Sequence, residues 1–160
     1  MILCALFETK FVNFEKFRGS VASPWGITVF GEDSIMISEG YSPAAYKGKS
    51  PHAAVVSTCD ESVMEAIKNT EIIIVPSDNM ELLRLLRGKN QVITCGLKNT
   101  DTVTVSSISE DCITIAVMRE MISVSGHTVC PREIPLKGRF VKECDIFTAM
   151  AGCVIPLICR

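Results

Sequence analysis

Eight cysteines and two histidines are the residues of this 160-residue sequence with the most obvious reactivity. A thiolate paired with an imidazole could act as the nucleophile of a covalent mechanism. The cysteines are scattered, and no Cys-x-x-Cys pair predicts a zinc site or a dithiol redox centre. Because His52 and His127 could each face several thiols, spacing singles out no pair. We expect mainly buried, reduced thiols that pack as small hydrophobic side chains, with a Cys-dependent enzyme as an alternative.

A second candidate site lies where two predicted parallel strands end. Asp78 and Asn79 follow the β-branched run 71–75 and open a predicted helix over 80–87. Ligands of open α/β folds bind at the carboxyl edge of the sheet, although N-capping of the helix would also explain Asp78. The first predicted strand covers 2–7, and the residues directly after it should lie at this same edge. The predicted ligand-binding residues are therefore Glu8, Thr9, Lys10, Asp78 and Asn79.

The tripeptide at 48–50, Gly-Lys-Ser, resembles the end of a phosphate-binding loop. The first glycine of that motif would fall at Pro43, and Pro51 follows directly. A phosphate cradle needs consecutive free N–H groups at the start of a helix, and no helical pattern continues beyond Pro51. We therefore predict no phosphate loop here, no catalytic residue, no metal ligand and no cofactor.

The elements that would position these residues alternate between strands and helices. Short apolar runs predict strands over 2–7, 53–57, 71–75, 91–96 and 102–106, and a hairpin over 27–38. Helices are expected over 10–18, 60–69, 80–87 and 143–158, with Ser57 or Thr58 capping the second and Pro156 kinking or ending the last. Residues 111–136 predict an appended antiparallel segment. The sequence thus indicates one α/β domain, 1–160, with a mostly parallel sheet flanked by helices.

Composition narrows the classes of partner. Hydrophobic residues make up 48% of the chain and charged residues 21%, with a formal charge of −2. This is a core-rich globular composition without the basic stripe that nucleic acid or an anionic membrane requires. The longest apolar run, 147–159, is too short to span a bilayer. We expect a cytoplasmic protein that binds a small ligand or a protein partner. The sequence leaves open whether the chain forms a homo-oligomer.

Several segments, in order, resemble the later half of the central domain of Mur ligases. Residues 92–97 (Val-Ile-Thr-Cys-Gly-Leu) and 101–108 resemble that family's Val-Ile-Thr-Tyr/Phe-Gly strand and the Ala-Thr-Val-Thr-Ala-Ser segment after it. Residues 134–139 are similar to its Leu-Pro-Gly-Arg segment, and 145–152 to its Asn-x-x-Asn-Ala-x-Ala-Ala helix. The resemblance covers about residues 53–159. It implies the fold of ATP-dependent amide-bond-forming enzymes of peptidoglycan precursor synthesis.

The departures from that family concern its catalytic parts. No glycine follows the first strand, where the family's phosphate loop should lie. Pro76 stands where the family has an asparagine that contacts adenine, and Asp145 and Thr148 replace asparagines of the last helix. The carboxylates and carbamylated lysine that hold magnesium have no identifiable counterpart. Phosphoryl transfer depends on those groups, so we expect a degenerate, non-catalytic binding or regulatory module. The alternative is a residual nucleotide-dependent enzyme completed by a partner.

Overall fold

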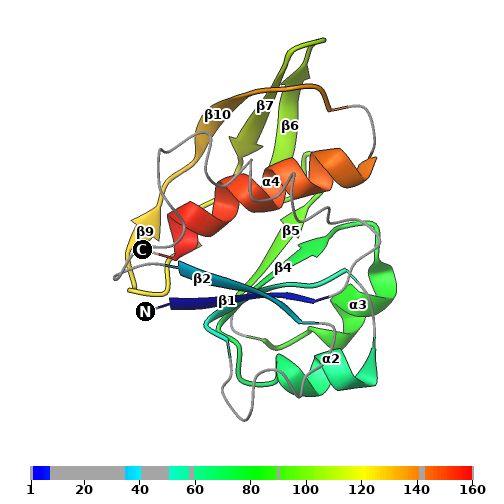
Figure 1. Ribbon diagram of the computed structural model, residues 1–160, viewed down its shortest axis with the longest axis vertical. Coiled ribbons are helices and arrows are strands. Elements are labelled where there is room, and N and C mark those ends of the chain that lie inside the picture. Colours follow the sequence, from blue (N-terminus) through cyan, green and yellow to red (C-terminus); the bar gives the residue numbers. More distant parts are fainter. Residues whose placement is uncertain are drawn as a thin grey trace.

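The computed structural model describes residues 2–7, 35–40, 51–57, 60–89, 91–140 and 143–159. Eight strands form one sheet in the order β10-β7-β6-β5-β4-β3-β1-β2, and β8 pairs with β9 separately (Figure 1). The strands are β1 Ile2–Phe7, β2 Ile35–Gly40, β3 Ala53–Val55, β4 Ile72–Pro76, β5 Gln91–Cys95, β6 Val103–Ile108, β7 Cys112–Val117, β8 Met121–Ile122, β9 Thr128–Val129 and β10 Arg132–Lys137. The helices are α2 Glu61–Ala66, α3 Met80–Leu85 and α4 Glu143–Ile158.

The parallel half of the sheet has a reversal in its strand order. Strand β1 lies between β2 and β3, and β3, β4, β5 and β6 then follow in sequence, all parallel. Parallel strands with this order need crossover connections that cover the faces of the sheet. The observed arrangement confirms the predicted α/β fold with a mostly parallel sheet.

Both faces of β4 are buried, which explains its β-branched sequence. Ile72 and Ile74 belong to the core shared with α4, whereas Ile73 and Val75 belong to the core shared with α2 and α3. Figure 1 shows α4 on one side of the sheet and the two short helices on the other. Strand β4 therefore holds its carboxyl end in a fixed position between two cores.

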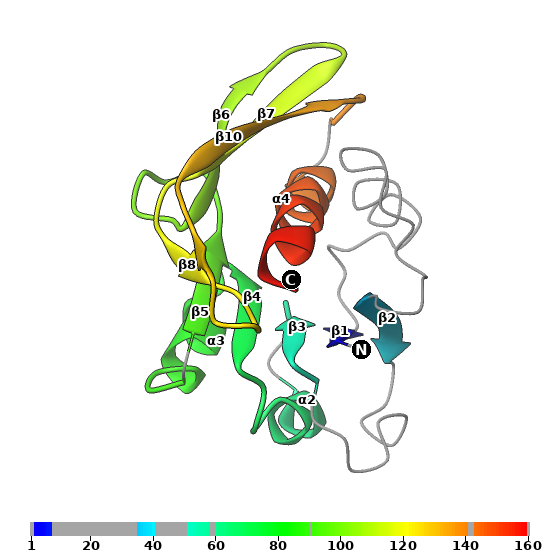
Figure 2. The ribbon, with the colours of Figure 1, turned by 90° about the vertical axis from the view of Figure 1, so that its left-hand side faces the viewer.

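The antiparallel half curls over α4. Strands β6 and β7 pair antiparallel with a register shift between Val105 and Ser107, and β10 pairs antiparallel with β7 at the edge. Figure 2 shows β6, β7 and β10 bending around the helix. Pro135 lies in β10, in keeping with the preference of proline for edge strands. This confirms the predicted antiparallel segment.

The two-stranded β8–β9 unit packs on the core of the main sheet through Met121 and Val129, and a side chain of β5 is hydrogen-bonded to it. The Gln91 amide donates from Nε2 to the Ile122 carbonyl oxygen at 2.8 Å, and its Oε1 accepts from the Ile122 N–H at 2.8 Å. These two bonds imitate a backbone pair. The turn predicted at 125–127 is present between the two strands.

Helix α4 is buried along most of its length. Phe147, Met150 and Val154 are among its core residues. Pro156 lies inside its last turn without ending it, because the helix continues to Ile158. No helix in the described ranges is long and apolar enough to cross a membrane.

The predicted cap of α2 is wrong, and several other predictions about local structure have no test. Helix α2 is capped by Asp60, which accepts a hydrogen bond from the Ser62 N–H at 2.8 Å; the predicted caps, Ser57 and Thr58, precede it. Residues 34–38 were expected in a hairpin, and the described partner of β2 is β1, in parallel. The predicted helix 10–18 and hairpin strand 27–30 lie outside the described residues, as does 43–50, where no phosphate loop was predicted.

Candidate functional site

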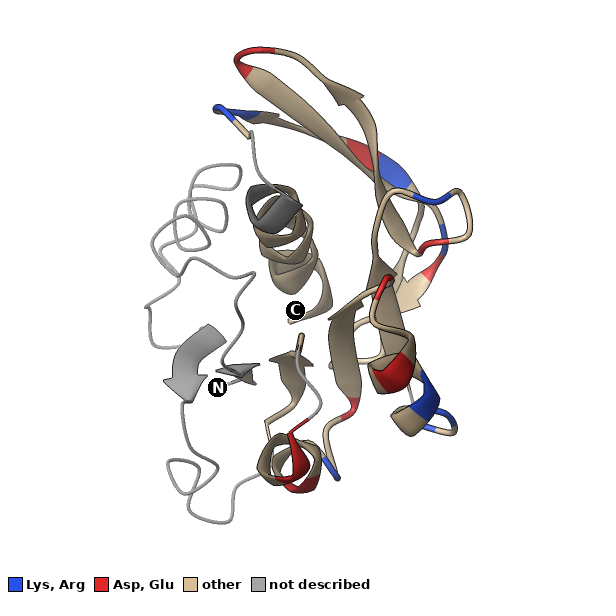
Figure 3. Ribbon diagram, turned by 90° about the vertical axis from the view of Figure 1, so that its right-hand side faces the viewer, with Lys and Arg blue, Asp and Glu red and all other residues tan. Residues whose placement is uncertain are grey.

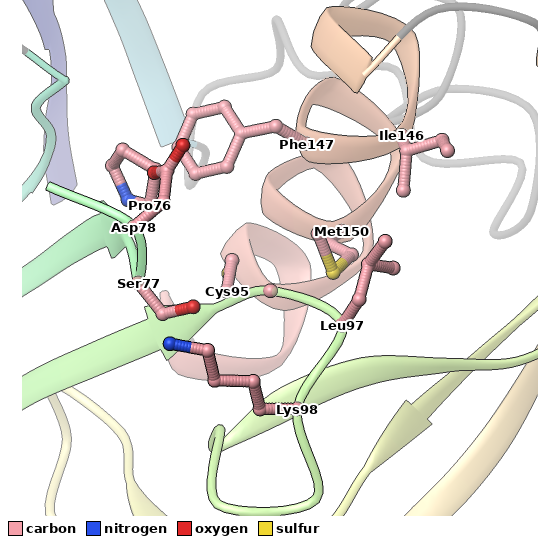
Figure 4. Close-up of a pocket in the computed structure, with 10 residues that line it drawn as sticks. Pro76, Ser77, Asp78, Cys95, Leu97, Lys98, Ile146, Phe147 and Met150 are labelled. Atoms are coloured by element: carbon pink, nitrogen blue, oxygen red, sulfur yellow. The ribbon is translucent and has the colours of Figure 1, made fainter.

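A pocket of about 220 Å³ lies at the carboxyl edge of the parallel strands. Its walls come from the segments that follow β4 and β5 and from the N-terminal half of α4 (Figure 4). Residues far apart in the sequence therefore meet at this edge, which is where open α/β sheets bind ligands. The lining residues are Pro76, Ser77, Asp78, Cys95, Gly96, Leu97, Lys98, Ile146, Phe147 and Met150.

A buried carboxylate holds the β4 and β5 segments together. Asp101 is 3% exposed, and its Oδ2 accepts a hydrogen bond from the Ser77 hydroxyl at 3.0 Å and from the Lys98 N–H at 2.9 Å. The Asp101 N–H donates back to the Lys98 carbonyl at 3.0 Å, which closes the turn after β5. A buried carboxylate is tolerated only when such donors satisfy it, so this network fixes the shape of the pocket.

Gly96 is required by the same network. A Cβ atom at Gly96 would overlap Ser77 Oγ and Asp101 Oδ2. The backbone directly after β5 therefore passes so close to the Ser77–Asp101 pair that only glycine fits. The Gly96 N–H is bonded to the Val103 carbonyl at 3.1 Å, which ties this position to β6.

Two buried thiols, that of Cys95 in the pocket wall and that of Cys153 nearby on α4, are held in the neutral form. Burial raises the pKa of Cys95 well above its usual range, with a smaller contribution from the negative charge of Asp101. Burial likewise raises the pKa of Cys153, on α4, to about 12. Only the thiolate is strongly nucleophilic, so these two cysteines match the expectation of inert, packed thiols. Cys130, by contrast, is exposed.

The predicted site residues have different positions. Asp78 is exposed and lines the pocket. Asn79 instead caps α3: its Oδ1 accepts from the Leu82 N–H at 3.0 Å, and its Nδ2 donates to the Ser57 carbonyl at 3.0 Å. The interpretation of Asp78 as the helix cap is therefore wrong. The other three predicted residues, at 8–10, lie outside the described residues.

Sequence reasoning missed Asp101, Lys98 and the face of α4 that lines the pocket. A glycine directly after a strand, followed five residues later by an aspartate, was the available signal for the Gly96–Asp101 unit. Nothing in the spacing links Ser77 to Asp101, because the contact spans 24 residues. Within the described ranges, no three His, Cys, Asp or Glu residues are grouped so that they could hold a metal ion.

Comparisons with known proteins identify the fold. No protein-family model matches the sequence, and the search of curated proteins finds no match. The solved structure of MurF ligase from Thermotoga maritima in complex with ADP matches with a TM-score of 0.60 and 12% identity. That alignment covers 98% of this chain and 45% of the ligase. A MurF structure from Acinetobacter baumannii matches at TM-score 0.54 and 12% identity, covering 98% of this chain and 42% of that one.

These matches show that the chain has a Mur ligase-like α/β fold, as the sequence resemblance implied. The chain spans less than half the length of those ligases. At 12% identity the likeness defines the fold and leaves the chemistry to be argued from the residues. The loss of the phosphate loop stays a prediction, since residues 8–11 lie outside the described residues.

Proposed function

We propose that this chain is a cytoplasmic binding or regulatory module on a Mur ligase-like fold, related to the cell envelope and without ligase activity. The proposal combines the fold with the residues at the ligand-binding edge. A ligase of this fold would have to hold a nucleoside triphosphate at the carboxyl edge of the sheet and neutralise its charge. The described residues at the ends of β4 and β5 use their backbone donors for hydrogen bonds within the protein.

The observation that carries the proposal is the use of backbone donors at this edge. The Ser77 N–H donates to the Cys95 carbonyl at 2.9 Å, the Gly96 N–H to Val103, and the Lys98 N–H to Asp101. A phosphate group is bound by consecutive N–H groups that are free to point at it. These three donors are already bonded within the protein, so none of them is available to a phosphate at the turns after β4 and β5. The segment after β1, where the resemblance places the phosphate loop, lies outside the described residues.

Pro76 supports the same conclusion. It is the last residue of β4 and lines the pocket. Its side chain has no hydrogen-bonding group, and its carbonyl accepts from the Asn79 N–H at 3.4 Å. In the Mur ligase resemblance this is the adenine-contacting position, so a nucleobase would lose its polar partner here.

The rival function is a residual nucleotide-dependent enzyme completed by a partner chain. One observation favours it: the T. maritima MurF structure that matches at TM-score 0.60 was solved with ADP. If this chain kept that property, Mg²⁺ and ATP together would bind to it and stabilise the folded state.

Thermal unfolding with and without ATP and Mg²⁺ separates the two functions. A ligand present at about 100 times its dissociation constant stabilises a protein by about 2.7 kcal/mol. For a chain of this size that corresponds to a rise in Tm of roughly 5–10 °C. We expect a rise below about 1 °C, and a rise of several degrees that needs both ATP and Mg²⁺ would favour the nucleotide-dependent enzyme.

A further inference from the structure

Two thiols meet at the C-terminal end of α4. Cys4 lies in β1, and Cys159 directly follows the last residue of α4. The side chain of Cys4 is hydrogen-bonded to that of Cys159, and both residues are buried in the core shared with α4. Figures 1 and 2 both show this end of α4 close to β1. Two residues far apart in the sequence therefore bring their sulfur atoms into contact.

The backbone holds both sulfur atoms in place. Cys4 is in the interior of the sheet, where β1 pairs with β2 on one side and with β3 on the other. The Cys159 N–H donates to the Ile155 carbonyl at 2.9 Å, and the Ile158 carbonyl accepts from the Val124 N–H at 2.7 Å. Two groups held in contact react with each other as if each were present at very high concentration. The arrangement therefore favours a bond between these two sulfur atoms over a bond to an outside thiol.

Burial determines how an oxidant can reach the pair. The hydrogen bond to Cys159 and burial raise the pKa of Cys4 well above its usual range, so Cys4 stays a neutral thiol. Cys159 is 6% exposed and lies just past the end of a helix, where fraying opens the structure at low cost. Cys159 is therefore the first of the two to meet an oxidant, when the end of α4 opens. A peroxide can enter through a small opening, whereas a bulky disulfide such as oxidised glutathione needs a wider one.

We propose that Cys4 and Cys159 form a disulfide when the protein meets hydrogen peroxide, and that this bond fastens the end of α4 to β1. The Cys159 thiolate attacks one oxygen of the peroxide and the O–O bond breaks, which leaves a sulfenic acid on Cys159. The released hydroxide takes up the proton that the Cys159 thiol gave up and becomes water. The Cys4 sulfur then displaces the hydroxyl group of the sulfenic acid, and the Cys4 proton leaves with it as a second water. Two thiols are thus oxidised to one disulfide while one peroxide is reduced to two waters.

The disulfide would act as a reversible link between two structural elements. In a reducing compartment such bonds form transiently and are removed by thiol exchange. A long stretch of chain separates Cys4 from Cys159, so the bond would restrict the unfolded state strongly. The inference goes beyond the proposed function and does not depend on it, because the pair lies at the opposite end of α4 from the pocket.

Peptide mapping by mass spectrometry without reduction tests the link. The reduced chain is incubated with hydrogen peroxide in a Cys130→Ser background, which removes an exposed thiol that could join two chains. We expect one main linked product, in which the peptide with Cys4 is joined to the peptide with Cys159. The Tm should rise by roughly 10 °C on oxidation and return to its starting value with dithiothreitol. Amide hydrogen exchange at Cys159 and Val124 should slow, because the end of α4 no longer frays.

Three alanine variants identify the pair. Cys4→Ala and Cys159→Ala should each abolish both the linked peptide and the rise in Tm. Cys153→Ala is the matched control, because Cys153 is also a buried cysteine of α4, and its only effect on the pKa of Cys95 comes from its charge. That variant should form the link and gain the same rise in Tm. Mapping of the chain without these replacements decides the question even where an alanine variant fails to fold.

The proposal is overturned if Cys4 and Cys159 stay reduced after prolonged exposure to peroxide, or if the main link joins other cysteines. It is also overturned if Cys159→Ala gains as much in Tm on oxidation as the chain that keeps Cys159. Binding of ATP and Mg²⁺ is measured separately on the reduced chain. A chain that forms no such disulfide and does not bind ATP would refute this inference and leave the proposed function standing.

Discussion

Replacing Gly96, at the edge of the pocket, by alanine should lower the free energy of unfolding. The added Cβ would overlap Ser77 Oγ and Asp101 Oδ2. Either the backbone directly after β5 moves away or the bond from the Ser77 hydroxyl to Asp101, 3.0 Å long, breaks. The variant therefore tests whether the network around Asp101 fixes the pocket.

The expected cost follows from the two consequences. Overpacking a close contact costs about 1–3 kcal/mol. Loss of a hydrogen bond to a buried charged group adds about 1.5–3 kcal/mol. Because relaxation relieves part of one cost or the other, we expect Gly96→Ala to lower the free energy of unfolding by about 3–4 kcal/mol. Burial of Asp101, at 3% exposure, keeps water from replacing the lost donor.

Urea denaturation measures this change. A lower midpoint with an unchanged slope would report lost stability without a change in the surface exposed on unfolding. The double variant Gly96→Ala, Ser77→Ala is the decisive control, because removing Oγ makes room for part of the new Cβ. We expect Gly96→Ala to cost at least about 1 kcal/mol less in the Ser77→Ala background, since contacting residues are not additive. A single-variant cost below about 0.5 kcal/mol, or full additivity, would refute the reasoning.

Three further predictions concern caps and thiols. Asn79→Ala should cost about 1 kcal/mol because it removes the N-cap of α3, whereas Asp78→Ala should cost less than about 0.5 kcal/mol; equal costs by urea denaturation would contradict this. The bonds from Ser62 hold the pKa of Asp60 below its usual 3.8, so the Asp60 carboxylate stabilises the fold above pH 3.8 and this contribution is lost as the pH falls through the lowered pKa. The difference in urea midpoint between the wild type and Asp60→Ala should therefore be full at pH 7 and shrink below pH 3.8; a difference that grows on acidification would oppose this. Mass spectrometry after alkylation of the folded chain should find Cys130 modified well before Cys95, because the Cys95 thiol is buried and its pKa is raised; faster modification of Cys95 would revive the Cys-dependent enzyme.

The backbone elements of the central sheet could be predicted because their local patterns agree with their environments. The run 71–75 is β-branched throughout, and β4 is buried on both faces. The predicted antiparallel segment was recognisable from extended sequence with prolines at strand ends and edges. These signals depend on neighbours in the chain, and the sequence contains them.

The helix caps and the pocket were harder to predict because several residues could do the same work. Ser57, Thr58 and Asp60 can each accept a bond from a helix N–H, and only the backbone geometry selects Asp60. The same ambiguity between Asp78 and Asn79 was resolved by the Leu82 N–H. The contact of Ser77 with Asp101 depends on how β4 and β5 pair, so no local pattern could reveal it.

The central claim is that a Mur ligase-like fold serves here for binding without a nucleotide site. Equilibrium dialysis of the full chain against radiolabelled ATP with Mg²⁺ tests it most directly. The account predicts equal label on both sides of the membrane at every ATP concentration. Saturable retention of one ATP per chain, lost when Mg²⁺ is withdrawn, would contradict it.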